Sequence, residues 1–252
     1  MATFIKSNKI IAGRNPLIEA LRGNQTIDKI LVFRNATGVQ ISTIKTLARE
    51  KSVPVQPVPM EKLNQITNVN HQGVIAFRSA VQFFELQDVI DFAVQKGETI
   101  LFVMLDGVTD VRNIGAIART AVCCGAQALI IPQKGVAALG EDALKSSAGA
   151  LEHIHICRVK TLTEAADLLL MNGISIAASQ MKAEMHLADV DLTVPMAIVM
   201  GSEETGVSAA VNEKAAVRFR IPMVGDFESL NVSVAAGMIL YEAMKQRLVK
   251  NA

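Results

Sequence analysis

The sequence predicts an α/β protein organised around a parallel sheet, and two observations lead to this fold class. Short apolar segments rich in β-branched residues alternate with amphipathic segments through most of the 252 residues, which is the pattern of βαβ units. The expected strands are apolar on both faces, as a parallel sheet covered by helices on its two sides requires. The clearest unit spans 100–132, where strands at 100–105 and 128–131 flank a helix.

A smaller α/β unit is expected in residues 1–80, before the pattern changes. Its helices are predicted at 15–21 and 39–51, and its strands at 30–33, 53–58 and 73–77. Prolines interrupt the 53–58 segment, and because proline cannot donate a ladder hydrogen bond, this strand belongs at a sheet edge. Residues 81–86 are interpreted as a linker, so that the second domain covers 87–252.

The larger domain continues the alternation to its last helix. Helices are predicted at 86–96, 139–150, 162–171 and 230–249, with strands at 154–159, 174–178, 195–200 and 217–221. Three polar loops, at 106–115, 201–206 and 223–229, each follow a strand, and open α/β sheets bind ligands at the carboxyl ends of their strands. We therefore expect a single site built from all three loops.

The first of these loops leads into the central helix. Asn113 is predicted to begin this helix as its N-cap, because asparagine side chains accept hydrogen bonds from the free amides of the first turn. Arg119 follows inside an otherwise apolar helix. An arginine in such a place either extends its charged end into solvent or positions an anionic or polar group.

Composition limits the class of protein. The net charge is +1, but residues 1–51 contain nine Lys or Arg against three acidic residues, a local +6, which leaves −5 for the rest. The basic amino-terminal end therefore favours a polyanion such as RNA, although a solvated surface explains it almost as well. Three cysteines without CxxC spacing predict no zinc site, no metal and no disulfide framework. Neither a secretory signal nor a membrane span is indicated, and a cytoplasmic location is expected.

The common nucleotide and hydrolase motifs are absent from the sequence. No GxGxxG follows a strand, and no GxxxxGK[ST] is present, so neither a dinucleotide fingerprint nor a P-loop is indicated. HExxH and GxSxG are also missing, which argues against a zincin and an α/β-hydrolase.

Three long motifs carry a resemblance to a known family. LDGVTDVRNIGAIARTA at 105–121, IVMGSEETGVS at 198–208 and IPMVGDFESLNVSVAAG at 221–237 resemble, in this order, the signatures of the SpoU (TrmH-type) RNA 2′-O-ribose methyltransferases. Residues 13–21 and HQGVIA at 71–76 are similar to the substrate-binding domain of that family, which is itself similar to ribosomal protein L30e. The resemblance is closest to the branch that methylates a guanosine of 23S rRNA.

The resemblance implies a fold, a cofactor and an assembly. It implies S-adenosylmethionine bound in a carboxyl-terminal trefoil knot, an L30e-like amino-terminal domain that binds RNA, and a homodimer. General chain rules would have excluded a knot, because threaded connections are nearly absent from proteins. Cofactor contacts, made largely through backbone groups, are implied at Gly201, Ile221 and Leu230.

The same resemblance assigns roles to polar residues of the three motifs. Arg119 is the implied activating residue, with Asn113, Ser229 and Asn231 orienting it or the ribose, and Glu203 as a charged partner. A guanidinium is effectively always protonated, so stabilisation of the developing alkoxide or of a phosphate is as good a role as that of a base. For Glu203 and Asn231, a loop salt bridge and a helix cap are the structural alternatives.

Substrate contacts and alternatives complete the prediction. The expected RNA-binding residues are Lys6, Lys9, Arg14, Asn15 and Arg22, with Arg14 the strongest candidate because a guanidinium grips phosphate with two parallel hydrogen bonds. Val111 departs from the family, which commonly has proline there, and this weakens the expectation of a stiff loop. A tRNA ribose methyltransferase is the alternative enzyme, and a non-catalytic RNA-binding protein of the same fold is the alternative from another class.

Overall fold

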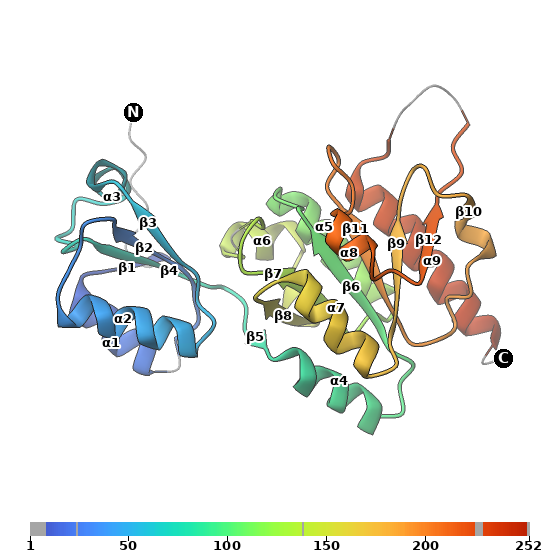
Figure 1. Ribbon diagram of the computed structural model, residues 1–252, viewed down its shortest axis with the longest axis horizontal. Coiled ribbons are helices and arrows are strands. Elements are labelled where there is room, and N and C mark those ends of the chain that lie inside the picture. Colours follow the sequence, from blue (N-terminus) through green and yellow to red (C-terminus); the bar gives the residue numbers. More distant parts are fainter. Residues whose placement is uncertain (1–8, 24, 138, 225–228, 251–252) are drawn as a thin grey trace. The chain divides into compact units, whose positions relative to one another are not determined.

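The chain divides into two compact units (Figure 1). They are Met1–Val81 with Ala138–Gly140, and Gln82–Ala137 with Glu141–Ala252. The computed structural model describes residues 9–23, 25–137, 139–224 and 229–250.

The first unit is a four-stranded mixed sheet covered on both faces. Its strand order is β1-β4-β2-β3, with β4 antiparallel to both neighbours and β2 parallel to β3. The strand β3 therefore lies at an edge, as its prolines predict. The strands are β1 (Ile10–Ala12), β2 (Ile27–Phe33), β3 (Val55–Val58) and β4 (Val74–Arg78).

Alternation along the strands gives this sheet two hydrophobic faces. Val74 and Ala76 of β4 join the core beneath α1 (Arg14–Arg22) and α2 (Val39–Glu50), while Ile75 faces α3 (Met60–Ile66). The side-chain period of two along a strand causes this division. Figure 1 shows α1 and α2 on one side of the sheet and α3 on the other.

The second unit contains an eight-stranded sheet, parallel at every pairing. The strand order is β10-β12-β9-β11-β6-β7-β8-β5. The strand β11 is inserted between β6 and β9, so the strand order reverses there and a crevice opens at the carboxyl ends. The strands are β5 (Phe83–Phe84), β6 (Leu101–Asp106), β7 (Ala128–Pro132), β8 (His155–Val159), β9 (Ser175–Ser179), β10 (Met185–His186), β11 (Met196–Gly201) and β12 (Val217–Arg220).

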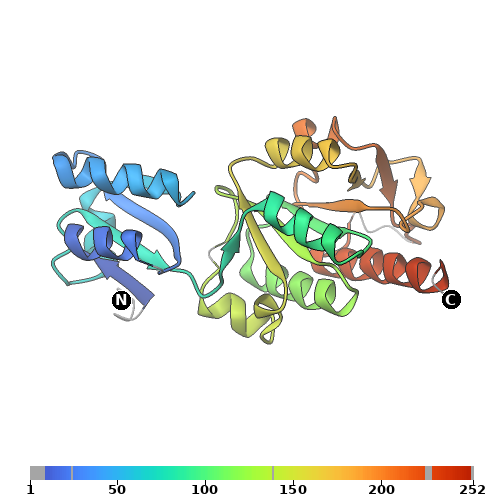
Figure 2. The same cartoon turned by 90° about the horizontal axis from the view of Figure 1, so that it is seen from below.

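Helices cover both faces of this sheet (Figure 2). Phe102 and Met104 of β6 belong to the core beneath α4, α7 and α8, and the alternate residues Leu101, Val103 and Leu105 are equally buried towards α5, α6 and α9. The helices are α4 (Leu86–Gln95), α5 (Val111–Cys123), α6 (Glu141–Ser146), α7 (Leu162–Met171), α8 (Ala209–Asn212) and α9 (Val232–Lys250), with 3₁₀ turns η2 (Ala150–Glu152) and η3 (Leu187–Asp189).

Local sequence explains where the clearest helix begins and ends. Thr161 is the N-cap of α7 and accepts a hydrogen bond from the Glu164 amide, in the TxxE spacing of a capping box. After the helix, Gly173 adopts a φ of 72°, a left-handed conformation that lets the chain turn back into β9.

Three sequence-based boundaries were wrong. The N-cap of α5 is Asp110, whose carboxylate accepts from the Arg112 amide at 2.8 Å, so Asn113 lies in the first turn instead. The 139–150 helix is interrupted because Ala148 and Gly149 have left-handed φ values of 50° and 86°. The expected 81–86 linker contains β5, which pairs with β8.

Short elements escaped prediction because they give little periodic signal. The sequence did not indicate β1, β5, β10, α3 or α8, and of these only α3 is longer than four residues. The trefoil knot stays a prediction.

The described part of the chain contains neither a membrane-spanning helix nor a metal-binding cluster. Within it, no helix is long and apolar enough to cross a membrane. The same residues contain no cluster of His, Cys, Asp or Glu that suits a metal ion. The described cysteines are all free, and burial raises the pKa of the Cys157 thiol to about 12.

Candidate active site

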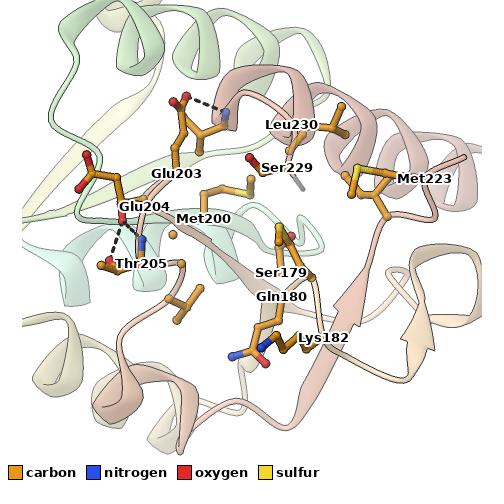
Figure 3. A pocket seen from close by; sticks show the side chains of 18 residues that line it. Ser179, Gln180, Lys182, Met200, Glu203, Glu204, Thr205, Met223, Ser229 and Leu230 are labelled. Carbon is orange, nitrogen blue, oxygen red and sulfur yellow. Dashed lines mark hydrogen bonds between the residues drawn. The ribbon is translucent and has the colours of Figure 1, made fainter. Parts of the chain in front are cut away.

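A cavity of about 490 Å³ lies at the carboxyl ends of β9, β11 and β12 (Figure 3). Its lining comes from residues 179–182 at and just beyond the end of β9, and from residues 200–207 at the end of β11. Further lining residues are Ile221, Met223, Ser229 and Leu230 between β12 and α9, and Val232 and Ala235 of α9. Two of the three polar loops predicted from the sequence therefore meet here.

The loop after β11 is a tight turn that closes on itself. The Ser202 and Gly206 backbones bond to each other in both directions, at 3.2 and 3.0 Å. The Ser202 hydroxyl also accepts from the Thr205 amide at 3.1 Å. The Asp106 carboxylate at the end of β6 accepts from the Ser208 amide at 2.7 Å, which ties the far end of the turn to the neighbouring strand.

Gly201 is required by the close approach of this turn. A Cβ built at Gly201 would lie 2.1 Å from the carbonyl carbon of Gly206 and 2.3 Å from the Val207 nitrogen. Both atoms are backbone, so no side chain can move aside to make room. The GSEETG segment thus folds back over the end of β11.

Glu203 links the starts of two helices. Its Oε1 accepts hydrogen bonds from the Asn113 side chain of α5 at 3.3 Å and from the Asn231 side chain at 2.7 Å. The same oxygen lies 3.3 Å from the Val232 amide, the first residue of α9. A carboxylate there is favourable because the free amides of a helix N-terminus carry partial positive charge.

Asn231 combines a helix cap with a place in this network. Its Oδ1 accepts from the Ser233 amide at 3.0 Å, and its Nδ2 donates to Asn113 and Glu203. The helix-cap alternative for Asn231 is therefore correct, but the cap is also a contact between the three sequence motifs. Glu203 pairs with amides and forms no salt bridge in the parts of the chain that are described.

Arg119 lies outside this arrangement. It is exposed on α5, does not line the cavity and makes no hydrogen bond or ion pair with any described residue. Because it follows Asn113 by six residues, about 240° around an α-helix, the two side chains leave α5 in different directions. Ser229 does line the cavity, beside Leu230.

Comparison with known proteins shows the family to which the chain belongs. The sequence pattern of the SpoU rRNA Methylase family matches residues 100–241, more than half of the chain. That of the RNA 2′-O ribose methyltransferase substrate-binding domain matches residues 10–84. The chain belongs to the SpoU rRNA Methylase family.

Relatives of the SpoU family match along nearly the whole chain. The putative TrmH family tRNA/rRNA methyltransferase YacO of Bacillus subtilis is 34% identical over 237 residues, which cover 94% of this chain and 95% of YacO. A Staphylococcus haemolyticus protein with the same family description is 35% identical over 238 residues, 94% of this chain and 96% of that protein.

A solved SpoU structure has a similar fold. AviRb from Streptomyces viridochromogenes, crystallised in complex with S-adenosylmethionine, superposes with a TM-score of 0.61 at 25% identity, over 95% of this chain and 90% of AviRb. As a SpoU family member, the present protein is an S-adenosylmethionine-dependent RNA 2′-O-ribose methyltransferase.

The cavity suits the SpoU cofactor in size and lining. Small-molecule sites commonly enclose roughly 300–1,000 Å³, and this one falls inside that range. The three residues expected to contact the cofactor, Gly201, Ile221 and Leu230, all line the cavity. Met200 adds apolar surface.

Sequence reasoning missed one wall of the cavity. Ser179 ends β9, and Gln180 and Lys182 follow it. The strand at 174–178 was predicted, but its loop was not counted among the polar loops although it too leaves the carboxyl end of a parallel strand. The rule that located the other loops would have found this one.

In the amino-terminal unit, Arg14 is held by its neighbours. Its Nε donates to the Gln72 carbonyl at 3.1 Å and its Nη1 to the Thr37 carbonyl at 3.2 Å. Asn15 accepts from the Gln40 amide at 2.6 Å. The Arg14 guanidinium therefore joins two loops through Nε and Nη1, and its Nη2 makes no hydrogen bond with a described residue.

The other expected RNA contacts are not gathered around Arg14. Arg22 is exposed in the last turn of α1, at the opposite end of that helix from Arg14. Lys9 directly precedes β1, and Lys6 lies outside the described residues. Among the described residues of this set, Arg14 and Asn15 are neighbours at the start of α1, whereas Arg22 lies at its other end.

Proposed function

We propose that this methyltransferase modifies the ribose of a guanosine in 23S rRNA, with S-adenosylmethionine bound in the cavity beside Gly201. The observation that carries the proposal is the contact between Asn113, Glu203 and Asn231, one residue from each sequence motif, next to a cavity lined by the expected cofactor residues. This meeting of residues far apart in sequence supports a site that aligns a methyl donor with a ribose.

The reaction assigns distinct tasks to these groups. S-adenosylmethionine supplies an electrophilic methyl group when it is bound. The ribose 2′-oxygen has to lie in line behind that methyl group, so orientation accounts for much of the rate. We assign orientation of the ribose to the Asn113 and Asn231 amides and to the Ser229 hydroxyl. Glu203 holds the two amides in place through its Oε1.

Arg119 is assigned to charge stabilisation. An unpaired, exposed guanidinium suits the developing alkoxide or the adjacent phosphate, because it stays protonated throughout. It does not line the cavity of its own chain, which favours a homodimer in which Arg119 of one copy serves the cavity of the other.

An apolar face on α9 supports that homodimer. Val234, Met238 and Tyr241 are spaced along one side of the helix and are 48%, 45% and 58% exposed. A row of large apolar side chains at helical spacing is typical of a protein interface. The mass of the protein in solution tests this pairing, and a monomer would contradict it.

We assign RNA binding to the amino-terminal unit. Its sequence matches a substrate-binding domain, and residues 1–51 carry a local charge of +6. Lys9 and Arg22 are assigned to phosphates, whereas Arg14 holds the loops around it in shape.

Methylation of tRNA is the second candidate, because the relatives in Bacillus and Staphylococcus are described as tRNA/rRNA methyltransferases. Mapping 2′-O-methyl groups in total RNA from cells with and without the gene separates the two. We expect one guanosine of 23S rRNA to lose its methyl group. Loss in tRNA alone would replace the rRNA assignment, and no loss in any RNA would favour a non-catalytic RNA-binding protein.

A further inference from the structure

The turn after β9 brings a cation to the cofactor cavity. Lys182 lines the cavity together with Ser179 and Gln180 (Figure 3). Among the described lining residues it is the sole Lys or Arg, whereas Glu203 and Glu204 contribute carboxylates. None of the three sequence motifs contains Lys182, which lies between the first and second of them.

The backbone around Lys182 is fixed. The Gln180 amide donates to the Phe219 carbonyl of β12 at 2.8 Å, and the Ala183 amide donates to the Gln180 carbonyl at 3.3 Å, which closes the turn. Ala183 is buried beneath it. Lys182 therefore occupies a defined position at the tip of the turn, while its side chain is exposed.

The ammonium group of Lys182 has no partner in the described parts of the chain. It forms no hydrogen bond or ion pair there, unlike Glu203, whose Oε1 bonds to two amides. In Figure 3, Lys182 and Gln180 lie together, apart from Glu203. Among the described residues, the Glu203 carboxylate at one end of the cavity is therefore hydrogen-bonded. The Lys182 ammonium at the other end has no partner and lies beside the Gln180 side chain.

The cofactor has a single anionic group, the α-carboxylate at the end of its methionine part. Binding a carboxylate in a cavity that already contains Glu203 and Glu204 is unfavourable unless a cation pairs with it. We propose that Lys182 binds this α-carboxylate, with the side-chain amide of Gln180 as a second donor. This inference rests on the proposed cofactor site and adds a residue outside the motifs.

Such a contact has a consequence for the reaction. Fixing the carboxylate at the β9 turn would fix the methionine end of the cofactor, while Gly201, Ile221 and Leu230 are the expected contacts for the rest of it. The direction of the sulfonium methyl group is then set from both sides. Lys182 is a binding and positioning residue in this arrangement, because it does not reach the reacting atoms.

A pair of ligands that differ only in the carboxylate tests the contact. The product S-adenosylhomocysteine and its decarboxylated analogue are titrated by calorimetry into the full-length wild type, Lys182→Ala and Lys182→Arg. We expect Lys182→Ala to weaken S-adenosylhomocysteine roughly tenfold, as for a charge-assisted hydrogen bond, and to leave the analogue unchanged. Lys182→Arg should retain most of the affinity, because it keeps the charge.

Lys134→Ala is the matched control, since Lys134 is exposed in the loop after β7, another strand of the same sheet, and does not line the cavity. Its affinities should equal those of the wild type for both ligands. The proposal would be overturned if Lys182→Ala weakened the binding of both ligands equally. It would also be overturned if Lys182→Ala left S-adenosylhomocysteine affinity unchanged and weakened RNA binding. In both cases the cofactor site itself would stand, because the wild type still binds the cofactor. A wild type that binds neither ligand would overturn the cofactor site itself.

Discussion

At the scale of single residues, the geometry of the site depends on a few positions, one of which, Gly201, has no side chain. Gly201 lets the GSEETG turn fold against β11, and Glu203 then reaches the start of α9. Asp110, not Asn113, caps α5, so the Asn113 Oδ1 can accept from Asn231 while its Nδ2 donates to Glu203. The motif residues act together because a few backbone contacts position them.

Gly201→Ala should abolish cofactor binding. The added methyl group would lie 2.1 Å from the Gly206 carbonyl carbon, so the turn that lines the cavity has to move. Calorimetry with S-adenosylhomocysteine measures the loss. Gly140→Ala is the control, since a Cβ there meets nothing within 4 Å and Gly140 does not line the cavity. Wild-type affinity in Gly201→Ala would show that the turn is not part of the site.

Val111→Pro should stabilise the protein by about 0.4–1 kcal/mol, because proline restricts the unfolded chain at a position that already suits it. Val111 is the first residue of α5, where proline is favoured, and Asp110 before it is extended at ψ 121°. Thermal unfolding measures the change. A lower midpoint would mean that the backbone at Val111 cannot accept a proline ring.

Arg119→Ala should stop methyl transfer and leave S-adenosylhomocysteine affinity nearly unchanged. The guanidinium does not line the cavity and forms no hydrogen bond or ion pair with a described residue, so its removal is expected to affect the substrate side alone. Single-turnover methylation of RNA measures the first effect and calorimetry the second. A parallel loss of cofactor affinity would instead place Arg119 in the cofactor site.

At the scale of elements, loops rather than helices or strands position the functional side chains in both units. In the amino-terminal unit, His71 holds the loop before β4: its Nδ1 accepts from the Gly73 amide at 3.1 Å, and its Nε2 lies 2.9 Å from the Asn64 oxygen. Since Nδ1 is the acceptor, Nε2 carries the proton and donates to Asn64. The neutral ring is thus built into the folded loop.

Acid should loosen this loop. Burial lowers the pKa of His71 below its ordinary value of 6.5, so as the pH falls the unfolded chain takes up a proton before the folded one does. Stability is complete above 6.5 and is lost as the pH falls from there towards the folded pKa. Hydrogen exchange in β2 and β4 between about pH 5 and pH 8 measures this. His71→Asn should flatten the pH dependence, and the exposed His153→Asn should leave it unchanged.

At the scale of the whole molecule, charge is distributed unevenly between the two ends of the chain. Residues 1–51 carry +6 and the remainder −5, although the total is only +1. The cofactor cavity, by contrast, has a single described cation in its lining. Binding of RNA is therefore expected to depend on the amino-terminal unit. The cytoplasmic location stays a prediction.

Replacing Lys6, Lys9 and Arg22 by Ala should weaken RNA binding and reduce its salt dependence. For single-stranded RNA, the slope of log affinity against log salt falls by roughly 0.7 for each phosphate that is no longer neutralised. Arg14 is left intact because it joins two loops. Titration of a 23S rRNA transcript at several salt concentrations measures the slope. The control carries Lys96→Ala and Lys134→Ala in the other unit. An equal change of affinity and slope in both variants would show that Lys6, Lys9 and Arg22 do not bind RNA specifically.

The sequence by itself determined the family and the alternation of strands and helices, because the three motifs and the apolar periods are local properties. The roles of the motif residues stay predictions. Tertiary structure decided how these parts combine. Strand order places β11 between β6 and β9, which brings Glu203 to Asn113 and Asn231 and makes the β9 turn with Lys182 a wall of the cavity. It also directs the donors of Arg14 onto the Gln72 and Thr37 carbonyls. Such contacts join residues distant in sequence, and their pairing is set by packing, which local patterns do not encode.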